Sequence, residues 1–288
     1  MTICIAAICE TAGAEAIITA CDKMVSMGGY VSGDKTIRKI DPILYDWTLM
    51  FAADDISPST PIIKEIRECP ATPETLKGVA DLIRRAYRNQ RHRQIEDEIL
   101  QPIGLSMKSF LSDGKNQLSE RAYEKVFDRI ESYDLGIELL IEGYDSRRDP
   151  HIFSVANPGK CNFYDKVGFW AIGSGQHQAI ASLFATGYDK YNPLEVCVAK
   201  VLVAKFMAES SVGVGKDTWL LIGRREVPNR SIFVDPPIQQ KVRDEHAALP
   251  KIPFNVLPDI QEAIEEQTKK LKEEAKPRLI SQMSQPKL

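Results

Sequence analysis

Short apolar runs separated by polar turns fill the first fifty residues of the chain. Residues 2–8 and 16–21 are rich in apolar and β-branched side chains, and the small and polar residues between them indicate a turn. Residues 47–52 form a continuous apolar run, which is typical of a strand buried on both faces. A further short strand is predicted at 36–40, after a break at residues 28–29. The start of the chain is therefore expected to form β-sheet.

Helical spacing of apolar residues follows the first strands. Residues 61–67 form a short amphipathic stretch. A longer helix is predicted to begin with Thr72 as its N-cap and Pro73 at its first position, and to extend to about Asn89. Both segments are expected to cover a sheet with their apolar faces.

From residue 91 the helical pattern weakens and then changes back to strands. Gly104 and the pair 113–114 indicate turns. The later elements are predicted as a helix at 122–130, strands at 136–143, 151–155 and 169–172, helices at 177–186 and 194–210, and a last strand at 218–222. Helices that are grouped apart from directly connected strands indicate a layered α+β fold and not alternating βαβ units.

The composition changes after Arg225. Prolines recur through a stretch that is typical of a linker, to about residue 257. Residues 259–275 then predict a helix with Glu-to-Lys pairs at i, i+4. Because its apolar residues are few, we expect it to dock lightly on its own domain or on a neighbour. The expected division is a folded domain at 1–225 and a tail at 226–288.

Composition and charge limit the classes of protein. Of the 288 residues, 43% are hydrophobic, and 37 basic against 40 acidic residues give a net charge of −3, which provides no general attraction to nucleic acid or anionic membranes. No apolar run approaches the ~18 residues of a membrane-spanning helix, and no leader is recognised before the first strand. We therefore predict a cytoplasmic protein.

One basic cluster offers an alternative. On a helix its members fall on more than one face, and acids follow directly, so a solvated or subunit-contacting helix is favoured over a nucleic-acid site. The cluster consists of Arg84, Arg85, Arg88, Arg91 and Arg93.

Cysteine and histidine positions argue against a metal site. Six cysteines and four histidines are scattered without a C-x-x-C pair, so neither a metal nor a cofactor is predicted. Cys4, Cys9 and Cys21 lie in apolar runs, where a free thiol is typically a small buried hydrophobic group in a reducing compartment.

Four features with possible chemistry occur in a fixed order. Thr2 begins the first predicted strand, Asp22 ends the second, Lys39 lies in the short strand after it, and Gly173-Ser174-Gly175 opens a helix. Each alone has an ordinary explanation: a chance threonine, a turn former, a solvated charge or a helix start. These ordinary explanations do not account for the occurrence of all four features together in this order of strands.

The combination resembles the proteasome β-subunit and HslV family of N-terminal nucleophile hydrolases. The resemblance covers about residues 2–222 and is carried by the stretches 18–24, 36–40, 49–54, 139–145 and 171–176. It implies a four-layer αββα sandwich, with the nucleophile at the start of the first strand and a C-terminal linker and helix beyond the family core.

The resemblance also implies a role for each feature. Thr2 would be the nucleophile and its own free α-amine the base, since an amine with a pKa near 8 is partly neutral at pH 7. Lys39 would place a positive charge beside the hydroxyl, and Asp22 would pair with Lys39. Ser174 would support the amine by a hydrogen bond.

Further positions carry over with departures from the family pattern. Ala53 stands where the family has a glycine whose backbone N–H meets the oxyanion, and a backbone donor survives that change. Ser210 and Gly213 stand where the family has a supporting Asp and Ser. The segment 91–120 resembles an insertion in the helical layer.

The resemblance makes processing decisive and implies partners. Removal of Met1 would free the amine of Thr2, whereas retention of Met1 would remove the base. A homo-oligomeric ring, a peptide or unfolded-protein substrate, and a regulatory or unfoldase partner are implied, with no nucleic acid and no membrane.

Three functions remain open from the sequence. The first is a threonine peptidase that forms an acyl-enzyme on Thr2. The second is a catalytically silent subunit with a structural or assembly role, and the state of the N-terminus separates it from the first. The third is an N-terminal nucleophile hydrolase that acts on a small amide, which a panel of peptides and amides would distinguish.

Overall fold

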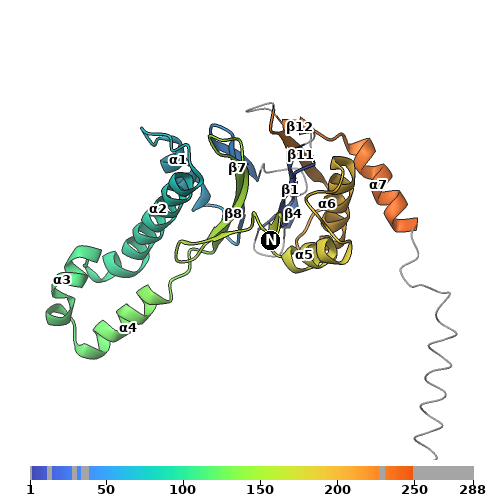
Figure 1. The fold of residues 1–288 in the computed structure, drawn as a ribbon. Coiled ribbons are helices and arrows are strands. Elements are labelled where there is room, and N and C mark those ends of the chain that lie inside the picture. Colours follow the sequence, from blue (N-terminus) through green and yellow to red (C-terminus); the bar gives the residue numbers. More distant parts are fainter. Residues whose placement is uncertain (1, 12–14, 28–30, 34–38, 227–230, 249–288) are drawn as a thin grey trace, which may run out of the picture. The chain divides into compact units, whose positions relative to one another are not determined.

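The computed structural model describes residues 2–11, 15–27, 31–33, 39–226 and 231–248. Contacts along the chain divide it into two units, Met1–Arg243 and Asp244–Leu288. Both large sheets and the candidate site belong to the first unit, and Figure 1 labels several of its elements. The domain boundary expected at residue 225 stays a prediction.

The first sheet contains the start of the chain in two of its interior strands. Within the described residues its strands are antiparallel in the order β10-β1-β2-β11-β12. They span β1 (Cys4–Cys9), β2 (Ala16–Asp22), β10 (Phe169–Ile172), β11 (Thr218–Arg224) and β12 (Ser231–Phe233). Every residue of β1 and β2 is buried, which explains their predominantly apolar sequence.

The second sheet is also antiparallel. Its described strands follow the order β5-β6-β7-β8-β9. They span β5 (Ile40–Leu44), β6 (Trp47–Ala53), β7 (Ile137–Tyr144), β8 (Pro150–Ala156) and β9 (Lys160–Phe163). A separate two-stranded pair joins β3 (Val25–Met27) and β4 (Val31–Gly33).

Helices pack on the outer face of each sheet. The second sheet is covered by α1 (Ser59–Arg67) and α2 (Leu76–Ile95), and the first by α5 (Gln176–Ala185) and α6 (Leu194–Ala208). The helical segment between α2 and β7 continues through a π-helical turn (Glu96–Leu100) and a 3-10 turn (Gln101–Ile103) into α3 (Met107–Gln117) and α4 (Glu120–Glu131). The last described helix is α7 (Pro236–Ala248).

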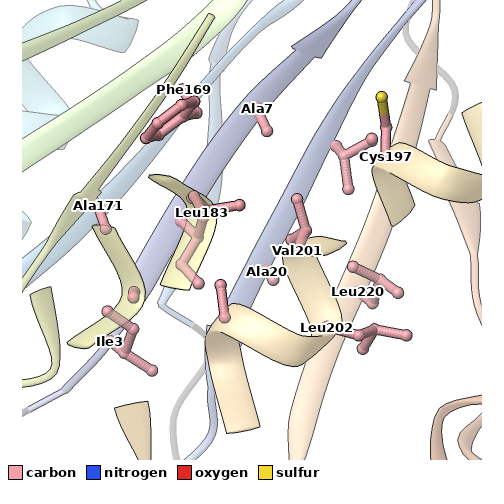
Figure 2. Packing of buried hydrophobic residues seen from close by; sticks show 14 of the residues in the cluster. Ile3, Ala7, Ala20, Phe169, Ala171, Leu183, Cys197, Val201, Leu202 and Leu220 are labelled. Carbon is pink, nitrogen blue, oxygen red and sulfur yellow. The ribbon is translucent and has the colours of Figure 1, made fainter. Parts of the chain in front are cut away.

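The side chains of β1 point alternately to the two faces of the first sheet and are buried on both. Successive residues of a strand point to opposite faces. Ile3, Ile5 and Ala7 therefore pack with residues of α5 and α6, a cluster shown in Figure 2, while Cys4 and Ala6 pack against the second sheet. A separate cluster joins the second sheet to α1 and α2. The result is the expected α+β fold with four layers, αββα.

Several predicted boundaries are wrong. The N-cap of α2 is Thr75 and not Thr72: the Thr75 hydroxyl accepts from the Gly78 N–H at 3.2 Å. This helix extends to Ile95, and α3 continues through the predicted turn at 113–114. Gly104 does form a turn, with φ +75°.

The C-terminal part of the described chain also differs from the prediction. Residues 236–248, predicted as linker, form α7, whose two prolines occupy first-turn positions where their missing N–H groups cost no hydrogen bond. Most of the predicted strand 36–40 and the whole predicted helix 259–275 lie outside the described residues.

Members of the basic cluster make contacts within the fold; Arg84, for example, donates to Gly159 O at 3.3 Å. Arg91 is buried and donates to the carbonyls of Ile130, Glu131 and Tyr133, at the end of α4. Arg93 pairs with Glu65 at 3.1 Å.

In the part of the chain that the structure describes, no helix has the length and apolar character needed to cross a membrane.

Candidate active site

Strand pairing brings three distant parts of the sequence to one end of the first sheet. Because β1 is antiparallel to both of its neighbours, the start of β1 lies beside the ends of β2 and β10. Cys4 is opposite Cys21 on one side and Ile172 on the other. Thr2 precedes β1, Asp22 ends β2, and residues 173–175 follow β10. These groups therefore meet at the same end of the strands of the first sheet.

The Thr2 hydroxyl lies between a carboxylate and an ammonium group. It donates to Asp22 Oδ1 at 2.5 Å and accepts a hydrogen bond from Lys39 Nζ. Lys39 Nζ is also 2.8 Å from Asp22 Oδ1, and both side chains are buried. An ammonium group beside the hydroxyl favours loss of the hydroxyl proton, which is what a threonine nucleophile needs.

Asp22 is fully buried and is held by backbone donors as well as by side chains. Its Oδ1 accepts from the Ile3 N–H at 2.9 Å, and its Oδ2 accepts from Met24 N–H at 3.2 Å and Gly215 N–H at 3.1 Å. A buried carboxylate is stable only when its lone pairs find donors. These contacts fix the carboxylate that orients Lys39.

Ser174 contacts the backbone of the candidate nucleophile. The Thr2 backbone nitrogen donates to Ser174 Oγ at 3.2 Å, and the Gly175 N–H donates to Thr2 O at 3.3 Å. The Ser174 hydroxyl also lies 3.2 Å from Val212 O. The turn after β10 therefore holds Thr2 from the side opposite Asp22.

Position 173 requires glycine because of both its backbone angle and the atoms around it. It has φ +100°, and a Cβ placed there would lie 2.4 Å from Thr2 O. That distance is far inside van der Waals contact with a backbone atom, so a side chain at this position would displace Thr2 itself.

We expect Gly173→Ala to destabilise the fold by about 3–5 kcal/mol, because left-handed strain and a backbone clash add. Gly187→Ala is the matched control, since Gly187 has φ +61° but a Cβ placed on it would have nothing within 4 Å. The control should cost only about 1 kcal/mol. Urea unfolding of both variants measures the difference, and equal costs would contradict the clash.

A cavity of about 490 Å³ opens at Thr2. Its lining comes from both sheets and includes Ala53, Gly173 and Ser174. Ala53 is opposite Ile137, while the Asp54 N–H donates to Gly136 O at 3.1 Å. Because hydrogen-bonded and non-bonded pairs alternate in an antiparallel ladder, the Ala53 N–H points away from β7.

Polar groups also line the cavity. Asp54, Asp134 and Glu138 supply carboxylates, and burial raises the pKa of Glu138. The side chain of Asn157 contributes an Oδ1 atom that is buried without a hydrogen-bond partner among the described residues. The cavity thus offers acceptors to a bound molecule.

The nearest thiols are not reactive at neutral pH. Burial raises the pKa of Cys4, two residues from Thr2, to about 12, and burial also raises the pKa of Cys21. A thiol with such a pKa stays protonated at pH 7, and the thiolate is the nucleophilic form. Thr2 therefore has no competing cysteine nucleophile beside it among these two residues.

The structure brings Thr2, Asp22, Lys39 and Ser174 into direct contact and places Ala53 at the same cavity. The hydroxyl of Ser210 is instead exposed and donates to Met207 O at 2.8 Å. Gly213 has φ +80° in the loop that follows α6.

The loop after α6 contributes to the candidate site through its backbone, which the sequence did not reveal. Its backbone supplies Gly215 N–H to Asp22 and Val212 O to Ser174, and backbone contacts leave no signature in residue types.

Among the described residues, no group of three or more His, Cys, Asp or Glu is arranged to hold a metal ion.

Comparison with known proteins gives likeness at the level of structure. No family model matches this chain, and no curated protein matches it. The chain is similar to Anbu (ancestral beta-subunit) from Yersinia bercovieri, with a TM-score of 0.58 and 15% identity, over 87% of this chain and 98% of that one. It is also similar to a Gly-1 mutant of Anbu from Hyphomicrobium sp. strain MC1, with a TM-score of 0.58 and 12% identity, over 88% and 99% of the two chains.

These likenesses confirm the α+β fold and correct the family assignment. The sequence features resemble the proteasome β-subunit and HslV family, whereas the similar solved structures are Anbu proteins, so that assignment is wrong. The physical reason is that the motifs lie at strand ends of the fold. Groups that share the fold also share those positions, and short motifs there do not separate the groups.

Proposed function

We propose that this chain is a hydrolase with an N-terminal threonine nucleophile, Thr2, that cleaves peptide bonds through an acyl-enzyme. The observation that carries the proposal is the Thr2 hydroxyl, which contacts both Lys39 Nζ and Asp22 Oδ1 at the wall of a 490 Å³ cavity. A buried, charge-paired hydroxyl that opens on a cavity meets the geometric requirement for an activated nucleophile.

The first step needs a base for the hydroxyl proton. Once Met1 is removed, the nitrogen of Thr2 becomes an α-amine with a pKa of about 8. The amine takes the proton, and Oγ1 attacks the substrate carbonyl carbon. The protonated α-amine of Thr2 then gives a proton to the leaving nitrogen as the C–N bond of the substrate breaks. This step leaves an ester on Thr2 Oγ1.

The second step releases the product. Water loses a proton to the amine and attacks the ester carbonyl, and Oγ1 leaves and recovers a proton. Lys39 stabilises negative charge on Oγ1 in both steps, and Ser174 holds the amine in place through the 3.2 Å contact with the Thr2 nitrogen.

Ala53 is proposed as the oxyanion donor. Its backbone N–H points away from β7, and the residue lines the cavity with Thr2. Backbone donors aimed at the developing negative charge are worth about 3–4 kcal/mol each in acyl transfer.

Mass spectrometry of the native protein, with and without a threonine-reactive electrophile, tests the proposal. We expect loss of Met1 and addition of one electrophile to Thr2, with faster labelling as the pH rises through the amine pKa near 8. A chain that retains Met1 and takes up no electrophile would contradict the proposal and favour a silent structural subunit. Self-assembly into a ring stays a proposal of the same kind.

A further inference from the structure

Lys205 is a fully buried cation that the proposed chemistry does not use. It lies in α6 with no exposed surface, beside apolar residues such as Leu202 and Ala208. Its Nζ donates to Gly215 O at 2.7 Å and to Lys216 O at 2.8 Å, and pairs with Glu209 one turn along the helix. All three ammonium contacts thus go to one segment, the loop 209–217 after α6.

The same loop is held from its outer side by α7. Arg243 donates to both carboxylate oxygens of Glu209, at 2.6 and 2.7 Å, and to Lys216 O at 3.2 Å. Its guanidinium group also lies 4.0 Å from the ring centre of Phe206. Glu209 therefore joins a cation from α6 to a cation from α7.

The inner side of the loop contacts the candidate active site. Gly215 N–H donates to Asp22 Oδ2 at 3.1 Å, while Gly215 O accepts from Lys205 at 2.7 Å. Val212 O, in the same loop, accepts from Ser174 at 3.2 Å. One glycine thus connects Lys205 to the carboxylate that orients Lys39.

Holding an ammonium group in this place is costly. Burial lowers the pKa of Lys205, against the effect of Glu209. An apolar side chain of similar volume at such a position is often neutral or stabilising. The contacts of Lys205 therefore do something that packing alone would not do, which is to order the backbone of residues 215–216.

We propose that Lys205 is a positioning residue that, with Glu209 and Arg243, fixes the loop 209–217 so that Gly215 holds Asp22 and Val212 holds Ser174. The catalytic consequence rests on the proposed function of Thr2, whereas the ordering of the loop does not. Through Arg243 the chain beyond the last large strand becomes part of the support of the site.

The test compares Lys205→Met with Lys200→Met in the full-length protein. Lys200 is the matched control, since it lies in the same helix and donates to Gly187 O and Asn192 Oδ1, away from the loop. Hydrogen exchange of the peptide 210–217 reports loop order without any need for activity. The maximal labelling rate of Thr2 and the apparent affinity for the electrophile are measured beside it.

We expect faster exchange of peptide 210–217 in Lys205→Met alone, with the labelling rate about tenfold to a hundredfold lower and the affinity nearly unchanged. Adding Ser174→Ala to Lys205→Met should cost less than Ser174→Ala alone, because both act through one loop. A purely structural role would lower the melting temperature and leave the labelling rate of the folded protein unchanged.

The outcomes separate this inference from the proposed function. If hydrogen exchange of peptide 210–217 is unchanged in Lys205→Met, the inference is overturned, whether or not Thr2 reacts. If exchange changes but the labelling rate of Thr2 does not, the proposed effect on catalysis is overturned. A wild-type chain that does not label refutes the proposed function and leaves the exchange result decisive for the loop. If Lys205→Met does not fold, Glu209→Gln and Arg243→Met carry the same comparison.

Discussion

Replacing Thr2 by alanine is expected to abolish both electrophile labelling and peptide hydrolysis, with a loss of roughly 10³-fold or more. The change removes Oγ1, the atom that contacts Lys39 and Asp22, and leaves neither of the neighbouring thiols able to replace it, because burial raises the pKa of both Cys4 and Cys21. Intact-mass analysis and a fluorogenic peptide assay measure the effect.

Two comparisons make the Thr2 result specific. Thr2→Ser keeps an oxygen nucleophile and should retain part of the activity. Thr11→Ala is the matched control, since Thr11 is another threonine near the N-terminus whose hydroxyl contacts the carbonyls of Tyr191 and Asn192 instead of the site. Hydrolysis that persists in Thr2→Ala would refute Thr2 as the nucleophile.

Replacing Lys39 by methionine is expected to lower the labelling rate of Thr2 by about 10²–10⁴-fold, the usual range for a group that assists proton transfer. Methionine fills similar space but removes the ammonium group that lies against both Oγ1 and the Asp22 carboxylate. The affinity for the electrophile should change little, because Lys39 is not among the residues that line the cavity. Labelling kinetics at several electrophile concentrations separate rate from affinity.

The Lys39 variant leaves a buried carboxylate without its cation, which by itself destabilises the fold. The double variant Asp22→Asn/Lys39→Met removes both charges and should recover stability while remaining unreactive. Lys190→Met is the control for loss of a paired lysine, since Lys190 pairs with Glu10 at 3.0 Å away from the site. A reactive double variant would contradict the role of Lys39.

Much of the fold could be predicted because burial imposes local patterns. The continuous apolar runs of β1 and β6 indicated strands covered on both faces, and the observed packing of β1 against helices on one face and a sheet on the other has that form. Boundaries were less predictable. At α2, either Thr72 or Thr75 has the hydroxyl of an N-cap, and only Thr75 accepts from the helix backbone.

Residue types identify only the side-chain part of the candidate site. Side chains with distinctive chemistry, Thr2, Asp22, Lys39 and Ser174, could be picked out because residue type is visible in a sequence. Backbone contributions could not, so the loop after α6 was judged by Ser210, whose hydroxyl donates to Met207 O, and not by Gly215. The arrangement of residues 236–248 as a helix was hidden by its prolines.

The sequence by itself determined where most of the long strands and helices lie and which residues have reactive groups, because periodicity and residue chemistry are local properties. Only the tertiary structure decided that Thr2 and Ser174, 172 positions apart, share a hydrogen bond, and that Lys205 is linked to Asp22 through Gly215. Those contacts depend on the register of antiparallel pairing and on the packing of α6 and α7. Such long-range geometry results from the whole core, and no local segment encodes it.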